Sequence, residues 1–149
     1  MLISAKADHA LRAVVEIAAG GDRPMRSADI AAAQGISVGF LRAILGDLRR
    51  GGLVTSRSGA TGGYRLTRPA SSISLAEVIR SVDGPYAEVG GVAPLELPHP
   101  GAAEPLRDVW LAVHANVRDV LEHTTVHHVA TRTLPDVVTT PLATEPTRR

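Results

Sequence analysis

The chain contains no cysteine and has few aromatic residues. Without cysteine, disulfide bonds, thiolate-ligated metal sites and cysteine nucleophiles are excluded, whereas histidine and carboxylate ligands remain available. Only one Trp, two Tyr and one Phe accompany a hydrophobic content of 44%. The core must therefore be built mainly from Ala, Val, Leu and Ile, which suits closely packed helices.

Long hydrophobic runs are also missing. Residues 1–8 contain no apolar segment as long as that of a signal peptide, and no later stretch approaches the length of a membrane span. We therefore expect a soluble, cytoplasmic protein that does not bind a membrane. A length of 149 residues fits one domain, or one small domain with an added arm.

The formal net charge is only +1, but the charges are unevenly distributed. Residues 1–70 contain ten basic and five acidic side chains, whereas residues 71–149 contain six basic and ten acidic ones. Residues 40–68 alone contain six arginines and one acidic residue. An ordinary solvated surface can show such an asymmetry, but a basic first half also indicates a module that faces phosphates.

Three helices are predicted in the first fifty residues. Apolar residues at spacings of three and four predict a helix over residues 5–19. Ser27 as the N-cap and Gly35 as the terminating residue enclose a second helix, residues 28–34. Ser37 caps a third helix, which a glycine pair ends. Two short helices separated by three residues that include a glycine are typical of a helix-turn-helix.

The third helix has one apolar and one basic face. Leucine and isoleucine recur at i, i+3, i+4 and i+7, which predicts a single buried stripe. The opposite face contains Gly39, Arg42, Gly46, Arg49 and Arg50. Small residues allow close approach to a DNA groove, and arginines reach phosphates or guanine edges. The alternative is an ordinary surface helix whose arginines serve solubility.

Residues 52–66 predict a β-hairpin directly after this helix. Glycines at positions 59, 62 and 63 permit positive φ angles in the turn, and Leu53 and Leu66 can point inward. Arg57, Arg65 and Arg68 are left to meet a DNA backbone or a minor groove. A nucleotide-binding loop is the alternative, but it would need a P-loop lysine and a strand-to-helix connection.

The rest of the chain contains fewer motifs. Ser74 caps a helix over residues 75–82, and a loop rich in proline and glycine follows. The sequence divides into a winged helix-turn-helix domain (1–84), this loop (85–104), a dimerisation helix region (105–130) and a disordered tail (131–149).

The helix predicted for residues 105–123 has a heptad seam. Its apolar residues recur at spacings of four, three, four and three: Leu106, Trp110, Val113, Val117 and Val120. A second copy of the chain would bury this seam. Packing against the first helix is the alternative.

Several motifs, in this order and spacing, resemble those of the Rrf2 family of bacterial transcription regulators. They are Asp8-His9-Ala10-Leu11-Arg12-Ala13, Ile36-Ser37-Val38-Gly39-Phe40-Leu41, Gly52-Leu53-Val54-Thr55-Ser56, Gly62-Gly63-Tyr64-Arg65-Leu66 and Val82-Asp83-Gly84-Pro85. The resemblance extends from Met1 to about Ala130.

The resemblance implies a mainly α fold with a small β-hairpin wing, in which a winged helix-turn-helix domain is joined to a long dimerisation helix. It implies a homodimer that binds double-stranded DNA at a pseudo-palindromic operator and represses transcription under the control of an effector. Many members hold an iron–sulfur cluster through three cysteines in the region of residues 85–105. No cysteine exists here, so we expect no cysteine-ligated cluster and no other cofactor. A small molecule or a partner protein would then act as the effector.

The candidate DNA-contacting residues come from the two short helices and the wing. Arg42 would read a base or bind a phosphate, Phe40 would contact a sugar or a thymine methyl group, and the arginines outside the helix start would supply nonspecific attraction. Ser27 and Ser37 would present capping groups and nearby amides to phosphates. The full set is Ser27, Ser37, Val38, Gly39, Phe40, Arg42, Arg49, Arg50, Arg57, Ser58, Gly59 and Tyr64.

Two positions depart from the family pattern. Members commonly have Val-Arg-Gly where this chain has Arg57-Ser58-Gly59, and a shift of one residue along a strand turns a side chain to the other face. His9 stands where a tyrosine is usual and would fill the same core space.

Six histidines raise the question of a metal site. His123 and His127 have the spacing that places two imidazoles on one helical face, and Glu122 or His114 could add a third ligand. Histidines at a helix end also interact well with the helix dipole. We therefore predict no metal site and keep His123 and His127 as its only candidates.

The other functional classes fit less well. A winged-helix module that binds protein, or a regulator controlled by a partner protein or small molecule, is the alternative to a DNA-binding repressor. An enzyme is not expected, because no carboxylate pair, catalytic triad or metal motif stands out in the sequence.

Overall fold

The structure, a computed structural model, describes residues 3–84, 96 and 98–144. It is mainly helical with one antiparallel hairpin, which confirms the predicted fold class. Its elements, in chain order, are α1 (Ala5–Ala19), α2 (Ser27–Gln34), α3 (Val38–Arg50), β1 (Val54–Arg57), β2 (Gly63–Leu66), η1 (Ala70–Ser72), α4 (Leu75–Asp83), η3 (Gly101–Ala103), α5 (Leu106–His123), α6 (Val126–Ala130) and α7 (Asp136–Thr144).

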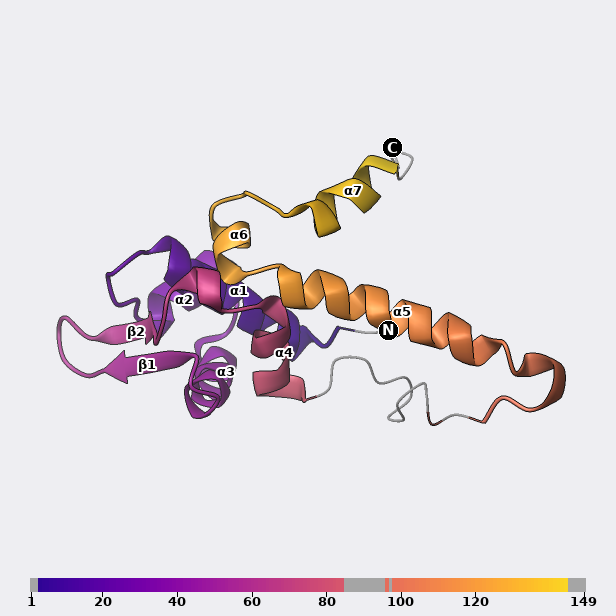
Figure 1. The fold of residues 1–149 in the computed structure, drawn as a ribbon. Coiled ribbons are helices and arrows are strands. Elements are labelled where there is room, and N and C mark those ends of the chain that lie inside the picture. Colours follow the sequence, from indigo (N-terminus) through magenta and orange to yellow (C-terminus); the bar gives the residue numbers. More distant parts are fainter. Residues whose placement is uncertain (1–2, 85–95, 97, 145–149) are drawn as a thin grey trace.

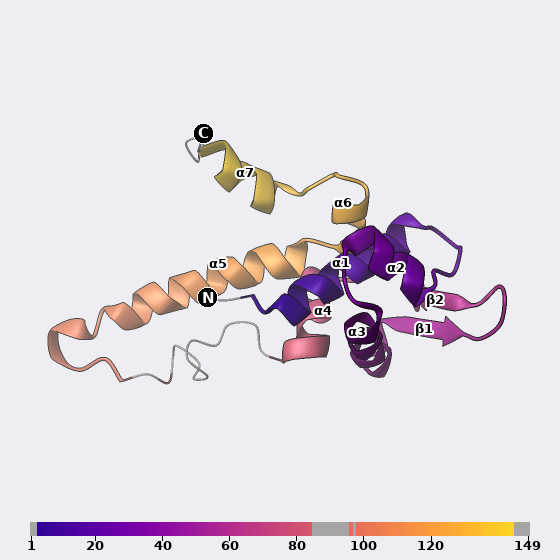
Figure 2. The ribbon, with the colours of Figure 1, turned by 180° about the vertical axis from the view of Figure 1, so that it is seen from behind.

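The helix-turn-helix and its hairpin form one end of the molecule, and α5 extends from the other side (Figure 1). The view from behind shows the same arrangement, with the hairpin tip and the first residues of α5 pointing in opposite directions (Figure 2). The long helix and the hairpin are thus held apart by the packed domain between them.

Helix α1 lies at the centre of this domain. Its N-cap Ser4 accepts a hydrogen bond from the backbone N–H of Ala7 at 2.9 Å. Ala10 and Ala13 are fully buried beside Val14 and Ile17. Such small side chains let α2, α3, α4 and α6 pack closely against α1, as the aromatic-poor composition predicts.

The predicted helix-turn-helix is formed by α2 and α3, which meet across a bend of 115°. The bounds of α2 correct one expectation: the helix begins at Ser27, and its N-cap is Arg26, which makes no side-chain capping bond. Ser37 does cap α3, where its hydroxyl accepts from the backbone N–H of Phe40 at 3.4 Å.

The hairpin is extended by a third segment of backbone. Within the hairpin, Val54 pairs with Leu66 and Arg57 with Gly63. Met25, just before α2, then pairs with Tyr64 through hydrogen bonds of 3.0 and 2.7 Å. The hairpin is therefore attached to the helix-turn-helix through its second strand, in a register that the local sequence does not reveal.

A break separates α5 from α6 at Thr124 and Thr125. The backbone there joins the start of α4, because Leu75 N–H donates to Thr124 O and Val126 N–H donates to Ile73 O, each at 2.9 Å. The helix predicted for residues 105–123 thus ends, as α5, at His123. The rest of the region 105–130 contains a separate short helix, α6, which packs against α1.

Helix α5 has α4 and α7 as its principal neighbours, whereas α1 is covered mainly by α4 and α6. The alternative in which α5 covers α1 is therefore not what the fold shows. None of the residues of α5 is buried in the single chain, so its apolar seam lacks a complete partner there.

The described part of the C-terminal segment corrects the predicted disordered tail. Residues 136–144 form α7, although Pro141 lies inside this helix. Because α7 packs against α5 and partly buries Val137 and Val138, tertiary contact offsets its poor local propensity. Residues 145–149, and most of the loop predicted over 85–104, lie outside the described residues.

Within the described residues, no single helix is long and apolar enough to cross a membrane. The helices α2 and α3 reach the length and apolar composition of a membrane span only when they are taken together, across their bend.

The hairpin's attachment leads to a prediction about Gly63. Its φ is +145°, and a Cβ there would lie 2.7 Å from the carbonyl carbon and oxygen of Met25. We expect Gly63→Ala to lower the free energy of unfolding, measured in urea, by about 2–4 kcal/mol. Gly59→Ala is the matched control, because Gly59 has a φ of +100° but open space around it, and should cost only ~1 kcal/mol. Equal losses of unfolding free energy in the two variants would show that the backbone at Met25 shifts at little cost to accommodate the added Cβ.

Candidate nucleic-acid interface

The buried face of α3 determines which of its residues are exposed. Leu41, Ile44, Leu45 and Leu48 are all fully buried, so the helix is anchored along its whole length. Gly39 and Arg42 lie on the exposed side near its N-terminus. A Cβ at Gly39 would meet no atom within 4 Å, so the surface there is open.

The side chain of Arg42 makes no hydrogen bond or ion pair with any residue that the structure describes. It is exposed, and the guanidinium keeps all of its donors for a ligand. Val38, in contrast, is half-buried against the core and supports the start of the helix.

Phe40 contacts α1 as well as solvent. Its ring meets that of His9 edge to face, with ring centres 5.4 Å apart, and 40% of the residue remains exposed. His9 therefore supports the start of α3, whereas the sequence suggested only that it fills core space. The exposed part of Phe40 remains available for a sugar or a methyl group.

The C-terminal half of α3 is held by charges on both sides. Nζ of Lys6 lies 2.6 Å from an Asp47 carboxylate oxygen and also donates to Val82 O at 3.0 Å, while Arg50 pairs with the other oxygen of Asp47. The hydrogen bond from Lys6 is the largest influence on the pKa of Asp47 and holds it below its usual value. Arg49 donates to Ser56 Oγ at 3.3 Å. Arg49 and Arg50 are thus partly occupied, unlike Arg42.

The wing presents Arg57, Ser58 and Gly59 to solvent. Strand register places Arg57 opposite Gly63 and therefore on the other face of the hairpin from Tyr64. Arg57 makes no hydrogen bond or ion pair within the described residues. Tyr64 is half-buried and packs on the core, so its contribution is to the base of the wing.

Arg26 also belongs to this surface, although no sequence pattern indicated it. Its Nη2 donates to Ala60 O, at the tip of the wing, at 2.7 Å. Ser27, which was predicted to contribute here, is half-buried as the first residue of α2. No local pattern signals the Arg26 contact, because it joins residues 34 positions apart.

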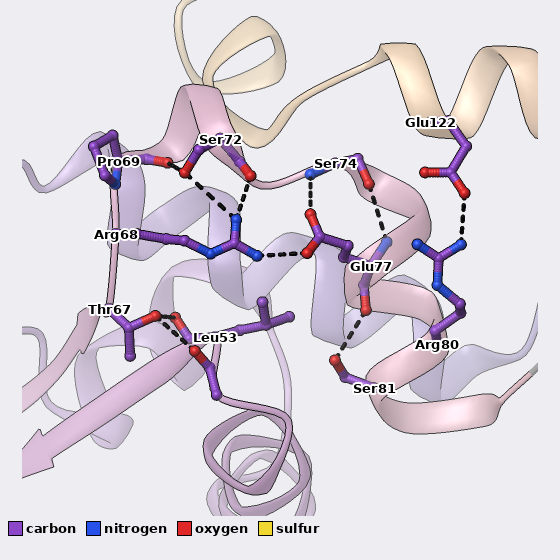
Figure 3. A network of polar contacts seen from close by, with 11 residues as sticks. Leu53, Thr67, Arg68, Pro69, Ser72, Ser74, Glu77, Arg80, Ser81 and Glu122 are labelled. Atoms are coloured by element: carbon purple, nitrogen blue, oxygen red, sulfur yellow. Dashed lines mark hydrogen bonds and ion pairs between the residues drawn. The ribbon is translucent and has the colours of Figure 1, made fainter.

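A polar network joins the base of the wing to α4 and α5 (Figure 3). Arg68, which follows β2, lies 2.5 Å from Glu77 of α4 and also donates to Ser72. Ser74 and Glu77 form a capping box that begins α4. One turn further on, Arg80 lies 2.6 Å from Glu122 of α5.

The charge of Glu77 is stabilised by this network. Burial acts to raise the pKa of Glu77, but the backbone N–H of Ser74 and the guanidinium of Arg68, with a contribution from Arg80, hold it below its usual value. The carboxylate therefore stays ionised and links the wing to α4 at neutral pH.

The two histidine candidates do not share one helix face. His123 ends α5, where its Nδ1 lies 2.9 Å from an Asp119 carboxylate oxygen, and His127 belongs to α6 beyond the break. Thr125 is the N-cap of α6, and His128 completes its capping box, since the Nδ1 of His128 accepts from Thr125 N–H at 3.1 Å. Over residues 3–84, 96 and 98–144, no three His, Asp or Glu side chains lie together as a metal site would need.

Comparison with known proteins matches residues 3–132 to the model of the Rrf2 family, described as an iron-dependent transcriptional regulator. Rv1287 of Mycobacterium tuberculosis, named as an HTH-type transcriptional regulator, is 46% identical over 139 residues, which cover 93% of this chain and 86% of that protein. The HTH-type transcriptional regulator CymR of Bacillus subtilis is 32% identical over 134 residues, which cover 89% and 92%.

Solved structures agree with these relatives. The structure of CymR, the global cysteine regulator of B. subtilis, superposes with a TM-score of 0.78 at 30% identity and covers 89% of this chain and 98% of that one. IscR of T. potens gives a TM-score of 0.72 at 27% identity, covering 89% and 88%.

The family description mentions iron, but this chain has no cysteine thiolate that could ligate it. The whole sequence lacks cysteine, and the described residues bring no three His, Asp or Glu side chains together. The residues present therefore do not fit a cluster held by cysteines.

The position of Glu77 predicts a pH-dependent stability. Arg68→Gln should raise the pKa of Glu77 toward its ordinary 4.5, as measured by NMR titration. Because the lowered pKa belongs to the folded state, its stabilisation is present above pH 4.5 and is lost as the pH falls through the folded pKa. The difference in unfolding free energy between the native chain and Arg68→Gln should therefore shrink from pH 7 to pH 3.

Arg107→Gln provides the control, because Arg107 is an exposed arginine of α5 with no side-chain partner among the described residues. It should leave the pKa of Glu77 unchanged. A stability difference for Arg68→Gln that stays constant over this pH range would contradict the assignment.

Proposed function

The chain belongs to the Rrf2 family of transcriptional regulators, and from this premise we propose that it is a homodimeric repressor that reads a pseudo-palindromic operator. The observation that supports this most directly is the exposed face of α3, where Arg42 has no partner within the described part of the chain and lies beside the open surface at Gly39. The adjoining wing adds Arg57, which is also without a partner among the described residues.

In this proposal α3 lies in the major groove with its N-terminal half nearest the bases. Gly39 lets the backbone approach closely, and Arg42 reaches a base edge, of which guanine is the best match for a guanidinium. Ser37 and the first amides of α3 face a phosphate. Arg49 and Arg50, already held by Ser56 and Asp47, add attraction to the phosphate backbone without reading sequence.

A second copy of the chain would bury the unpartnered side of α5. Leu106 and Val113 are each 45% exposed, and Val109 beside them is 52% exposed. Together with the half-buried Trp110, Val117 and Val120, they form an apolar stripe long enough for a helix–helix interface. Two-fold symmetry would then place two α3 helices about 34 Å apart, one turn of DNA.

We propose that the regulator works without a cysteine-ligated iron–sulfur cluster, since the chain has no thiolate to hold one. Its effector would be a small molecule or a partner protein that changes the dimer.

The whole proposal is tested by fluorescence anisotropy on a labelled duplex from upstream of the chain's own gene, against a shuffled duplex, at two salt concentrations. Tight binding that depends on sequence supports a repressor that needs no cluster. No binding at low salt would refute DNA recognition and favour a winged-helix module that binds protein.

Arg42 should carry part of the sequence preference. We expect Arg42→Ala to weaken operator binding by about 1–3 kcal/mol and to relax the preference at the base pair it reads. Arg107→Ala removes the same charge at the far end of α5 and should leave that preference unchanged. Selection of duplexes by each variant is the measurement, and an intact preference at every position in Arg42→Ala would contradict the role.

The seam of α5 should govern the oligomeric state. Val113→Lys places a charge in the middle of the stripe and should weaken the dimer by about 3 kcal/mol or more, roughly a hundredfold, because an apolar side chain of each copy loses its burial. Ala115→Lys adds the same charge on the exposed opposite face and should have no such effect. Sedimentation equilibrium distinguishes the two, and a Val113→Lys dimer of native strength would exclude this interface.

A further inference from the structure

The tip of the wing, residues 58–62, has one side-chain hydrogen bond within the described part of the chain. Nη2 of Arg26 donates to Ala60 O at 2.7 Å. The backbone closes the turn itself, since Gly62 N–H donates to Gly59 O at 3.1 Å. Among the described residues, the tip therefore has a single polar link to the helix-turn-helix, and Arg26 makes it.

Arg26 is placed to make this link by its neighbours. Met25 pairs with Tyr64, and Arg65 donates to Asp22 O from two nitrogens, at 2.6 and 3.1 Å. These bonds fix the base of the hairpin beside the segment before α2. Arg26, as the N-cap of α2, extends the same attachment to the tip, and its side chain is not used to cap its own helix.

Resting on the proposed DNA-binding function, we propose that Arg26 is a wing-positioning residue. By holding Ala60, it fixes the tip relative to α2 and thereby sets where Arg57 and Ser58 meet the duplex. A hydrogen bond from a charged donor is stronger than a neutral one. A wing held in place before binding also loses less conformational freedom on DNA, which favours tight and directed contact.

In this proposal, the contact between Arg57 and DNA depends on the position of the wing tip. Arg57 lies on the hairpin face opposite to that of Tyr64. It can therefore reach a DNA groove only if the hairpin is oriented with this face toward the duplex. A hairpin fixed solely at its base would let the tip swing, because residues 58–62 have no other side-chain bond among the described residues. Arg26 removes that freedom.

The free protein tests the contact without DNA. Amide hydrogen exchange at Gly62 should be about three- to tenfold faster in Arg26→Ala than in the native chain, the factor expected for one lost hydrogen bond. Arg23→Ala is the matched control, because Arg23 is an exposed arginine of the same loop with no side-chain partner among the described residues. Equal exchange in the two variants would overturn the proposal.

The complex tests the positioning. The absence of cysteine allows a single label, so Thr61→Cys carrying an iron chelate would cleave the operator where the wing tip lies. At saturating protein, cleavage in the Arg26→Ala background should fall about threefold at its maximum and spread to neighbouring positions, as expected for a tip freed from one hydrogen bond. In the Arg23→Ala background the cleavage pattern should keep its position and width.

The outcomes distinguish a failure of the role of Arg26 from a failure of the proposed DNA-binding function. An unchanged cleavage pattern in Arg26→Ala overturns the positioning role even if the operator is bound tightly. If the native chain binds operator and shuffled duplexes equally, the proposed function and the role of the wing on DNA both fail. The exchange data at Gly62 would still decide whether Arg26 holds the tip.

Discussion

The complete burial of the apolar stripe of α3 is the constraint on which the candidate nucleic-acid interface depends. Each of Leu41, Ile44, Leu45 and Leu48 is removed from solvent, and each contributes about 1.5–3 kcal/mol by that burial. Rotating α3 to bury its other face would expose these side chains and place arginines in the core. The exposure of Gly39 and Arg42 therefore follows from the packing of the opposite side. The surface that we propose faces DNA is rigid because the core behind it is rigid.

The wing obtains its rigidity differently, from the backbone of a segment far from it in sequence. A two-stranded hairpin alone is marginally stable in water. Here Met25 pairs with Tyr64, and Gly63 leaves room for that approach. Arg68 and Glu77 then tie the end of β2 to α4, whose Arg80 contacts α5. The wing is thus connected through α4 to the helix that we propose as the dimer interface. In this proposal, an effector that moved α5 would act on the DNA-binding surface through that connection.

Helix α5 shows the opposite situation, a helix whose burial is incomplete in one chain. Its packing against α4 and α7 leaves Leu106, Val109 and Val113 largely exposed. A contiguous apolar surface of this kind marks an interaction site. Since family membership implies a regulator that acts on DNA, a symmetric pair of chains would meet both the physical need of α5 and the geometric need of a two-fold operator.

The sequence by itself determined helices α1 to α5, the hairpin and the exposed face of α3, because periodic apolar residues, N-cap serines and turn glycines act within a few residues. It also determined that cysteine-ligated clusters are excluded. Only the tertiary structure decided that Arg26 reaches Ala60, that Lys6 holds Asp47, and that the backbone around Thr124 and Thr125 pairs with the start of α4. It likewise formed α7 where composition predicted a disordered tail. These features arise from contacts between segments far apart in the chain, whose energies outweigh local propensity and leave no trace in a local pattern.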